Sequence, residues 1–181
     1  MKKMSKVLVG VITAAAVMTL ASCAPPGAAR SANGNAIGKT FKIGYDIEMT
    51  GALAAYGKGS ERGADMAVAE LNASGGINGK KIEVSKKDNK SDNAESATVA
   101  ANLMSNDKVN AVIGTNASSQ TKAMIPNATK FAVPIVAPTS TNDELTHKGN
   151  QVEKYVFRAI FPDSFQGKVI SDFVTNNLKD E

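Results

Sequence analysis

The chain contains no tryptophan, one cysteine and one histidine, and only 5% of its 181 residues are aromatic. A single cysteine, Cys23, cannot form a disulfide bond within the chain. Cys23 and His147 are too few ligands for a typical zinc site, and a serine hydrolase would depend on His147 alone as its base. We therefore expect no metal, no cofactor and no enzymatic activity.

A strong excess of one charge is also missing. The 21 Lys and Arg residues and 17 Asp and Glu residues leave a formal net charge of +4. Three of the positive charges, Lys2, Lys3 and Lys6, lie in a segment that we expect to be removed, and without them the net charge is +1. No run of five like charges occurs, so the sequence predicts no nucleic-acid partner.

The first 22 residues have the pattern of an export signal. A short basic stretch, 1–6, precedes an uncharged apolar run, 7–21, that is short for a membrane span. The run ends in Leu20-Ala21-Ser22-Cys23, which resembles the lipobox of bacterial lipoproteins. We expect residues 1–22 to be a lipoprotein signal peptide and Cys23 to carry acyl chains such as palmitate. The alternative is a chance buried cysteine in an uncleaved helix.

Acyl chains on Cys23 would anchor the protein to the outer side of the cell membrane, in the periplasm or at the cell surface. Residues 23–39 contain Pro25-Pro26 and several Gly, Ser, Ala and Asn residues, a composition that suits a flexible linker. Disordered filler without a spacing role would have the same composition. The folded domain is expected at 40–181.

Beyond residue 40, strand and helix patterns alternate. Such alternation predicts an α/β fold with a doubly wound parallel sheet and helices on both faces. In the last helix, Val169, Phe173 and Val174 are predicted to face the core. The expected strands are 41–47, 81–87, 110–114, 133–137 and 155–160. Three of the expected helices begin at Ser60, Ser118 and Asp163, and a fourth follows Asp92, which is predicted to cap it.

Ligands of such sheets bind at the carboxyl ends of the strands, so the loops after Ile47, Gly114 and Ala137 are the candidate site. In the first loop, Tyr56 offers an apolar ring and a hydroxyl. In the second, Ser118 begins a helix whose free N–H groups favour a carboxylate. Tyr56 as a loop anchor and Ser118 as a helix cap are the alternatives.

The third loop, 138–142, contains three adjacent hydroxyl side chains, at Thr139, Ser140 and Thr141. They could form hydrogen bonds with a small polar ligand. Taken alone this signal is weak, because Ser and Thr are common in loops.

Several motifs occur in order between about residue 41 and the end of the chain. Together they resemble the leucine/isoleucine/valine-binding branch of the type I periplasmic solute-binding proteins. The most specific are the turn Asn72-Ala73-Ser74-Gly75-Gly76-Ile77-Asn78-Gly79-Lys80 and the loop Ala137-Pro138-Thr139-Ser140-Thr141-Asn142; Phe41-Lys42-Ile43-Gly44, Thr50-Gly51, Ala55-Tyr56-Gly57, Gly63-Ala64, Val112-Ile113-Gly114, Phe157-Arg158 and Gln166-Gly167 accompany them.

This resemblance implies a two-lobed receptor that closes on an amino acid and delivers it to an ABC-type permease. It implies that Ser118, Thr139 and Thr141 hold the α-carboxylate of the ligand and that Tyr56 forms a wall of the site. Members of the family are much longer than this chain. We therefore expect only the N-terminal lobe, with the second lobe missing, in a truncated product or an incomplete gene model.

Three residues depart from the family pattern. Ser140 would make the pocket floor more polar, Asp143 replaces a frequent proline, and Ser91 stands where some members have a disulfide cysteine.

Two other functions stay open: a truncated surface lipoprotein without ligand binding, and the same fold binding an amide, urea or an aromatic acid. The glycines at 57, 59 and 63 do not have the spacing of a dinucleotide-binding loop.

Overall fold

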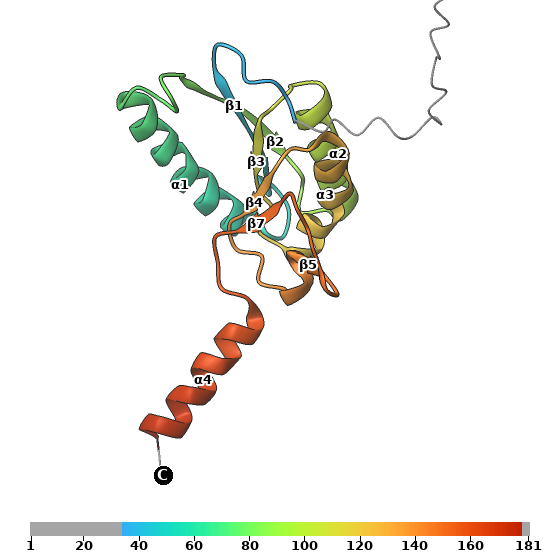
Figure 1. Cartoon of the computed structure of the whole chain (residues 1–181). Helices are drawn as coiled ribbons and strands as arrows, with labels where there is room; N and C mark the ends of the chain where they lie inside the picture. The colour runs from blue at the N-terminus through green and yellow to red at the C-terminus, as the bar shows by residue number, and fades with distance from the viewer. Residues whose placement is uncertain (1–33, 179–181) are drawn as a thin grey trace, which may run out of the picture.

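The computed structural model describes residues 34–178. The predicted signal peptide, Cys23 and the first part of the predicted linker lie outside these residues. Within them, a five-stranded parallel sheet has the order β2–β1–β3–β4–β7 (Figure 1). Its strands are β1 (Phe41–Ile47), β2 (Ile82–Asp88), β3 (Ala111–Ile113), β4 (Ile135–Ala137) and β7 (Val156–Arg158).

Helices cover both faces of this sheet. Helix α1 (Ala54–Ala73) lies on one face, and α2 (Asn93–Ser105) and α3 (Ser118–Phe131) lie side by side on the other (Figure 1). The chain runs from β1 outward to β2 and then returns past β1 to β3. The direction of winding therefore reverses between β1 and β3, and the predicted doubly wound fold is confirmed.

The start of α2 follows its predicted chemistry. The side chain of Asp92 accepts a hydrogen bond of 2.8 Å from the backbone N–H of Glu95. This bond satisfies one of the backbone donors that the first turn of a helix leaves unpaired. The capping pattern therefore locates this helix correctly.

The predicted start of α1 at Ser60 is wrong, because the helix begins at Ala54. The glycine-containing stretch before Ser60 is helical where it contacts the end of β1. A Cβ atom at Gly57 would overlap the backbone carbonyl of Glu48, so only glycine allows the helix to come this close. Glycine indicates a loop in the sequence but serves close packing in the fold.

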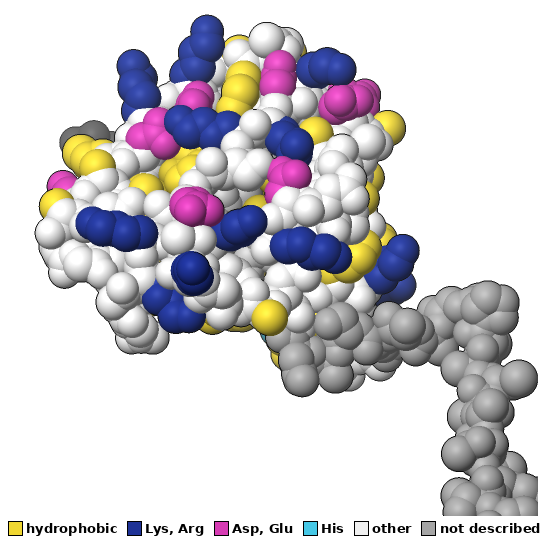
Figure 2. Space-filling view, turned by 90° about the horizontal axis from the view of Figure 1, so that it is seen from above, with side chains coloured by type: hydrophobic (Ala, Val, Ile, Leu, Met, Phe, Trp, Pro, Cys, Tyr) yellow, Lys and Arg dark blue, Asp and Glu magenta, His cyan; other side chains and the backbone are white. Residues whose placement is uncertain are grey.

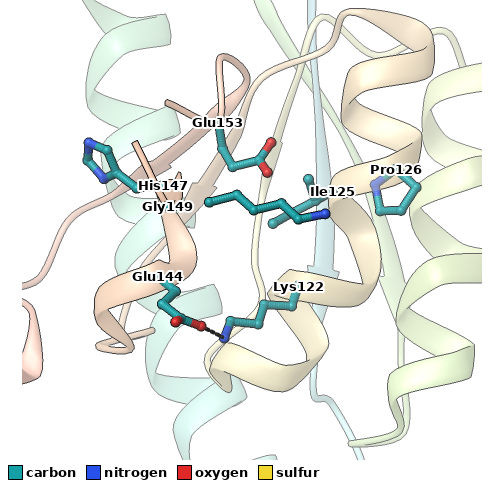
Figure 3. A pocket seen from close by; sticks show the side chains of 8 residues that line it. Lys122, Ile125, Pro126, Glu144, His147, Gly149 and Glu153 are labelled. Atoms are coloured by element: carbon teal, nitrogen blue, oxygen red, sulfur yellow. Dashed lines mark ion pairs between the residues drawn. The ribbon is translucent and has the colours of Figure 1, made fainter. Parts of the chain in front are cut away.

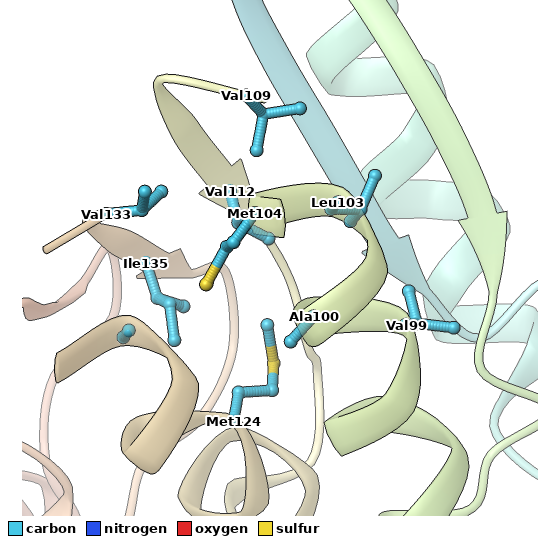
Figure 4. Packing of buried hydrophobic residues seen from close by; sticks show 10 residues of the cluster. Val99, Ala100, Leu103, Met104, Val109, Val112, Met124, Val133 and Ile135 are labelled. Carbon is cyan, nitrogen blue, oxygen red and sulfur yellow. The ribbon is translucent and has the colours of Figure 1, made fainter. Parts of the chain in front are cut away.

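The hydrophobic core lies between the sheet and the pair α2 and α3 (Figure 4). Leu103 of α2 is fully buried, and its side chain contacts the position where a Cβ of Gly44 in β1 would stand. The buried members of this cluster include no aromatic ring, although Phe131 and Tyr155 pack against it and Tyr45 of β1 is also fully buried. The buried members are Val99, Ala100, Leu103, Met104, Val109, Val112, Met124, Ala128, Val133 and Ile135.

The other face of the sheet is packed less completely. Gly57 is the one residue of α1 that is buried, and Leu71 of the same helix is 44% exposed. Helix α4 (Asp163–Asn177) extends away from the sheet (Figure 1) and has no buried residue. The inward orientation predicted for Val169, Phe173 and Val174 is therefore wrong, since nothing among residues 34–178 covers them.

Two small elements have no counterpart in the sequence prediction. A short 3-10 helix, η1 (Asp143–Leu145), follows the loop after β4, and a small hairpin of β5 (His147–Lys148) and β6 (Gln151–Val152) comes next. Both are too short to produce a periodic pattern.

The described end of the predicted linker is attached to the domain. The side-chain amide of Asn35 donates hydrogen bonds to the carbonyls of Met104 (2.9 Å) and Val109 (2.8 Å). The Asn110 side chain in turn donates to the carbonyl of Asn35 at 2.9 Å. The folded unit therefore includes residues from Asn35 onward, before the predicted boundary at 40.

Candidate functional site

Three loops meet at the carboxyl edge of the sheet. Strand β1 pairs with β3, and β3 pairs with β4, all in parallel register. The segments that follow Ile47, Ile113 and Ala137 are therefore neighbours, as predicted from the strand order. This edge lies where the winding reverses, the usual ligand position in open parallel sheets.

Ser118 is the first residue of α3 and does not cap it. The N-cap is Ala117, and no side chain bonds to the first turn as a cap. The Ser118 hydroxyl oxygen instead accepts a hydrogen bond of 3.2 Å from the backbone N–H of Asn142. The capping alternative is therefore wrong, and this bond brings the second and third loops together.

The first turn of α3 retains donors for a ligand. The backbone N–H groups of Ser118 and Ser119 have no acceptor within the helix, and no other described residue supplies one. The Ser118 hydroxyl proton is likewise not donated to any described residue. These groups stand at the positive end of the helix dipole, which favours an anion.

Thr139 and Thr141 differ in what their hydroxyls do. The Thr139 hydroxyl donates to the loop at Asn116, whose backbone O and Oδ1 lie 3.1 and 3.0 Å away. The Thr141 hydroxyl makes no hydrogen bond with the described residues, while its backbone carbonyl accepts one from Arg158. Thr141 therefore has a hydroxyl free to donate, and the Thr139 hydroxyl is already used.

Arg158, at the end of β7, orders the third loop, a role that the sequence analysis missed. Its Nη1 donates to the carbonyls of Thr141 (3.0 Å) and Asn142 (2.9 Å). Its Nη2 donates to the carbonyl of Asp143 and to Oγ1 of Thr146, both at 3.2 Å. One guanidinium thus fixes two carbonyls of the third loop and two groups in and after the 3-10 helix η1 that follows it. The Phe157-Arg158 motif was the available signal.

Tyr56 lies in the first turn of α1 and is 63% exposed. Its ring contacts no other aromatic side chain or cation among the described residues, so the structure does not support its role as a buried loop anchor. One turn further along α1, the Ser60 hydroxyl donates to Oδ1 of Asn116 at 2.7 Å. The start of α1 therefore borders the second loop.

The first loop is held by Asp88 and Ser91. Asp88 accepts from the backbone N–H groups of Met49 (3.0 Å) and Thr50 (3.1 Å) and from the Thr50 hydroxyl (2.6 Å). Burial acts to raise the pKa of Asp88, but these bonds and one from Lys90 lower it below its usual value. The Ser91 hydroxyl donates to the Thr50 carbonyl at 2.8 Å and so links the first loop to the segment after β2.

Asp46 is a fully buried carboxyl group on β1 near this edge. Its Oδ1 accepts a hydrogen bond of 2.9 Å from the Asn89 side chain, and its Oδ2 has no partner among the described residues. Burial is the main cause that raises the pKa of Asp46, the bond from Asn89 opposes it and the neighbouring Glu48 adds to it, so that the pKa is about 8. Asp46 is therefore mainly protonated at neutral pH.

A separate hollow of about 350 Å³ lies between α3 and the β5–β6 hairpin (Figure 3). Its charged side chains partly neutralise each other, since Lys122 and Glu144 form an ion pair of 3.6 Å. Ser118, Thr139, Thr141 and Tyr56 do not line it. The lining residues are Lys122, Ile125, Pro126, Glu144, His147, Lys148, Gly149 and Glu153.

The surface facing the viewer in Figure 2 shows Lys and Arg side chains scattered among Asp and Glu. Among residues 34–178, none of the helices combines the length and apolar character that crossing a bilayer requires. In the same part of the chain, His, Cys, Asp and Glu side chains form no group of three or more that could hold a metal ion.

A family model described as "Periplasmic binding protein" matches residues 40–180. The chain belongs to this family. Its members are solute-binding proteins rather than a class of enzymes, and membership implies an extracytoplasmic location. The resemblance noted in the sequence is thereby confirmed.

Relatives of known function include proteins that bind amino acids. The chain is 36% identical over 137 residues to an amino acid binding protein of Pseudomonas aeruginosa, covering 76% of this chain and 36% of the relative. It is 32% identical over 144 residues to the Leu/Ile/Val-binding protein of Escherichia coli K12, covering 80% and 38%. The chain thus spans less than half the length of these relatives.

Solved structures show the same lobe. A branched-chain amino acid transporter substrate-binding protein of Streptococcus pneumoniae, in complex with isoleucine, is 50% identical with a TM-score of 0.69, covering 77% of this chain and 39% of that one. A solute-binding protein of Rhodopseudomonas palustris, in complex with 3,4-dihydroxybenzoic acid, is 28% identical with a TM-score of 0.67, covering 77% and 37%. The described fold therefore corresponds to one lobe of such proteins.

Proposed function

We propose that the chain forms the first lobe of an ABC transporter substrate-binding lipoprotein that captures branched-chain or related amino acids for import. The observation that carries the proposal is the meeting of Ser118 and the loop of Thr141 at the carboxyl edge of the sheet. The isoleucine complex of the 50% identical relative supports this choice of ligand.

The arrangement suits the α-carboxylate of an amino acid. The Ser118 and Thr141 hydroxyls and the N–H groups of Ser118 and Ser119 are donors without acceptors among the described residues. Hydrogen bonds from such donors to a charged group each contribute about 1.5–3 kcal/mol. The N-terminal end of α3 adds a favourable partial charge. Tyr56, exposed beside this edge, is the proposed wall of the site.

The groups for the ammonium of the ligand are proposed to come from a second lobe, because the chain spans 36% to 40% of its relatives' length. We therefore expect this lobe alone to bind an amino acid weakly. NMR titration of the ¹⁵N-labelled chain with leucine, isoleucine, valine, alanine and glutamate tests the proposal, since it detects weak binding. Shifts of the Ser118, Ser119 and Thr141 amides are expected; a panel that moves none of them contradicts the proposal.

An aromatic acid is the second candidate, favoured by the dihydroxybenzoic acid complex of the Rhodopseudomonas palustris relative. Benzoate carries the same carboxylate but no ammonium and no aliphatic side chain. Adding 3,4-dihydroxybenzoate to the titration panel separates the two. Stronger binding of the benzoate than of isoleucine would replace the amino acid in the proposal.

The proposal includes attachment to the membrane through Cys23, which lies outside the described residues. The sequence pattern Leu20-Ala21-Ser22-Cys23 supports it. An anchored receptor stays close to its permease, the proposed protein partner, while it exchanges ligand with the surrounding medium.

A further inference from the structure

Glu48 follows β1 directly and is fully buried, although it is a carboxylate in a loop. Its Oε1 accepts hydrogen bonds from the backbone N–H groups of Asn116 (2.9 Å) and Ala117 (3.4 Å). Its Oε2 accepts one of 2.6 Å from the Asn116 side-chain amide. One buried carboxylate therefore satisfies three donors in the segment that leads into α3.

Asn116 also bonds to α1 and to the third loop. Because its Nδ2 faces Glu48, its Oδ1 faces away and accepts from the Ser60 hydroxyl of α1 at 2.7 Å. The Thr139 hydroxyl of the third loop lies 3.0 Å from the same oxygen. The buried network thus joins all three loops of the candidate site and the first turns of α1.

We propose that Glu48 is a positioning residue of the ligand site, which holds the segment 115–117 so that Ser118 and Thr139 take their places at the carboxyl edge. This inference rests on the proposed function. Glu48 does not touch the ligand, because it is fully buried and both of its oxygens already accept hydrogen bonds.

The charge and shape of Glu48 both matter to this role. A glutamine at this position has one acceptor and one NH₂ group, and whichever way its amide turned, its NH₂ would face a donor of Asn116 as that residue now lies. If the Asn116 side-chain amide turned to accept from it, its Oδ1 would no longer accept from Ser60 and Thr139. Either a buried donor is left without a partner, or the bonds to α1 and to the third loop are lost. An underpaired buried group of this kind corresponds to about a tenfold change in an equilibrium constant, or more.

The chain offers a matched control on the same strand. Asp46 is a second buried carboxyl group, two residues earlier, but its one hydrogen bond comes from Asn89 and none comes from the segment 115–117. Because burial keeps Asp46 mainly protonated at pH 7, Asp46→Asn changes little there. The effect on ligand binding of removing a buried carboxyl group can therefore be compared between Glu48 and Asp46.

The test is an NMR titration of the full chain with L-isoleucine at pH 7. We expect Glu48→Gln to weaken binding about tenfold or more and Asp46→Asn to change it by less than about twofold. In a Ser118→Ala background, the loss caused by Glu48→Gln should shrink, because positioning acts through Ser118. Wild-type affinity in Glu48→Gln, or a loss of equal size in both backgrounds, overturns the proposal.

Two further measurements test the role of Glu48 if Glu48→Gln does not fold or if the wild-type chain binds no ligand. If Glu48→Gln does not fold, Asn116→Ala removes the same network from its other side, and unchanged isoleucine affinity in that variant contradicts the proposal. If the wild-type chain binds no member of the panel, the proposed function fails by itself. Amide hydrogen exchange then decides on positioning: Glu48→Gln must speed exchange at residues 116–118 relative to Asp46→Asn, and equal rates overturn it.

Discussion

The hydroxyl oxygen of Ser118 accepts a hydrogen bond of 3.2 Å from the backbone N–H of Asn142. This bond joins the start of α3 to the loop after β4 and leaves the Ser118 proton free for a ligand. Two segments separated by more than twenty residues thus present donors at one place. Substitutions of Ser118 and Thr141 test whether these donors bind a ligand.

Replacing Ser118 with alanine should weaken amino acid binding by about 1–3 kcal/mol, because a ligand carboxylate then lacks one hydrogen-bond partner. Calorimetric titration measures the change. Ser119→Ala is the matched control, since this neighbour offers its backbone N–H, which the substitution keeps. Equal losses in both variants would contradict the assignment of the Ser118 hydroxyl.

Thr141→Val removes a hydroxyl that has no partner among the described residues and keeps the shape of the side chain. Binding should weaken by about 1–3 kcal/mol. The free energy of unfolding without ligand should change little, because the Arg158 bonds to this loop use backbone carbonyls. Unchanged affinity in both Thr141→Val and Ser118→Ala would remove the carboxylate assignment altogether.

Leu103→Ala should lower the free energy of unfolding by about 2–5 kcal/mol, since Leu103 is fully buried between α2 and β1. Phe173→Ala, in α4, should change it by less than about 0.5 kcal/mol because Phe173 is 55% exposed in this chain. Urea unfolding of both variants measures the contrast. A large loss from Phe173→Ala would mean that α4 is covered in solution.

The sequence predicts local features of this fold more reliably than distant ones. Asp92 and Glu95 lie within one turn, so their pattern already contains the interaction that caps α2. The apolar period of α4 identifies a helix with an apolar face but does not say what covers that face, and Val169 is exposed. Glu48 gave no signal, because its partner Asn116 is distant in sequence and a single carboxylate after a strand has no diagnostic spacing.

Part of the candidate ligand site could be predicted from the sequence, and part could not. Strand order brings Ser118 and the loop of Thr141 together, and this could be predicted because parallel strands end at the same edge. That the Thr139 hydroxyl is used by Asn116, and that Arg158 orders the third loop, depends on side-chain directions that periodicity does not contain. The role of each residue toward a ligand stays a prediction.

Cys23→Ala should abolish lipid attachment, since the thiol is the atom that would carry the diacylglycerol. Expressed in a bacterial host, the wild-type chain is expected in the detergent phase after Triton X-114 partitioning and the variant in the aqueous phase. Ser31→Ala, in the same segment, should behave like the wild type. Detergent-phase recovery of Cys23→Ala would contradict lipidation at this residue.

The contribution of Asp46 to the free energy of unfolding should fall as the pH rises from about 4 to about 8. Burial raises the pKa of its carboxyl group from the ordinary value of 3.8 to about 8, so across this window the folded state holds a proton that the unfolded chain has released. The contribution is complete below the lower value and is lost as the pH passes the higher one, with a slope of at most about 1.4 kcal/mol per pH unit.

Asp46→Asn removes this titration, so its free energy of unfolding relative to the wild type should rise between pH 5 and pH 9. Urea unfolding at the two pH values measures the difference. Asp88→Asn is the control: the pKa of Asp88 is lowered, so this group titrates below the window and its substitution should cost the same at both pH values. A pH-independent effect of Asp46→Asn would show that Asp46 is ionised in the folded protein throughout the range.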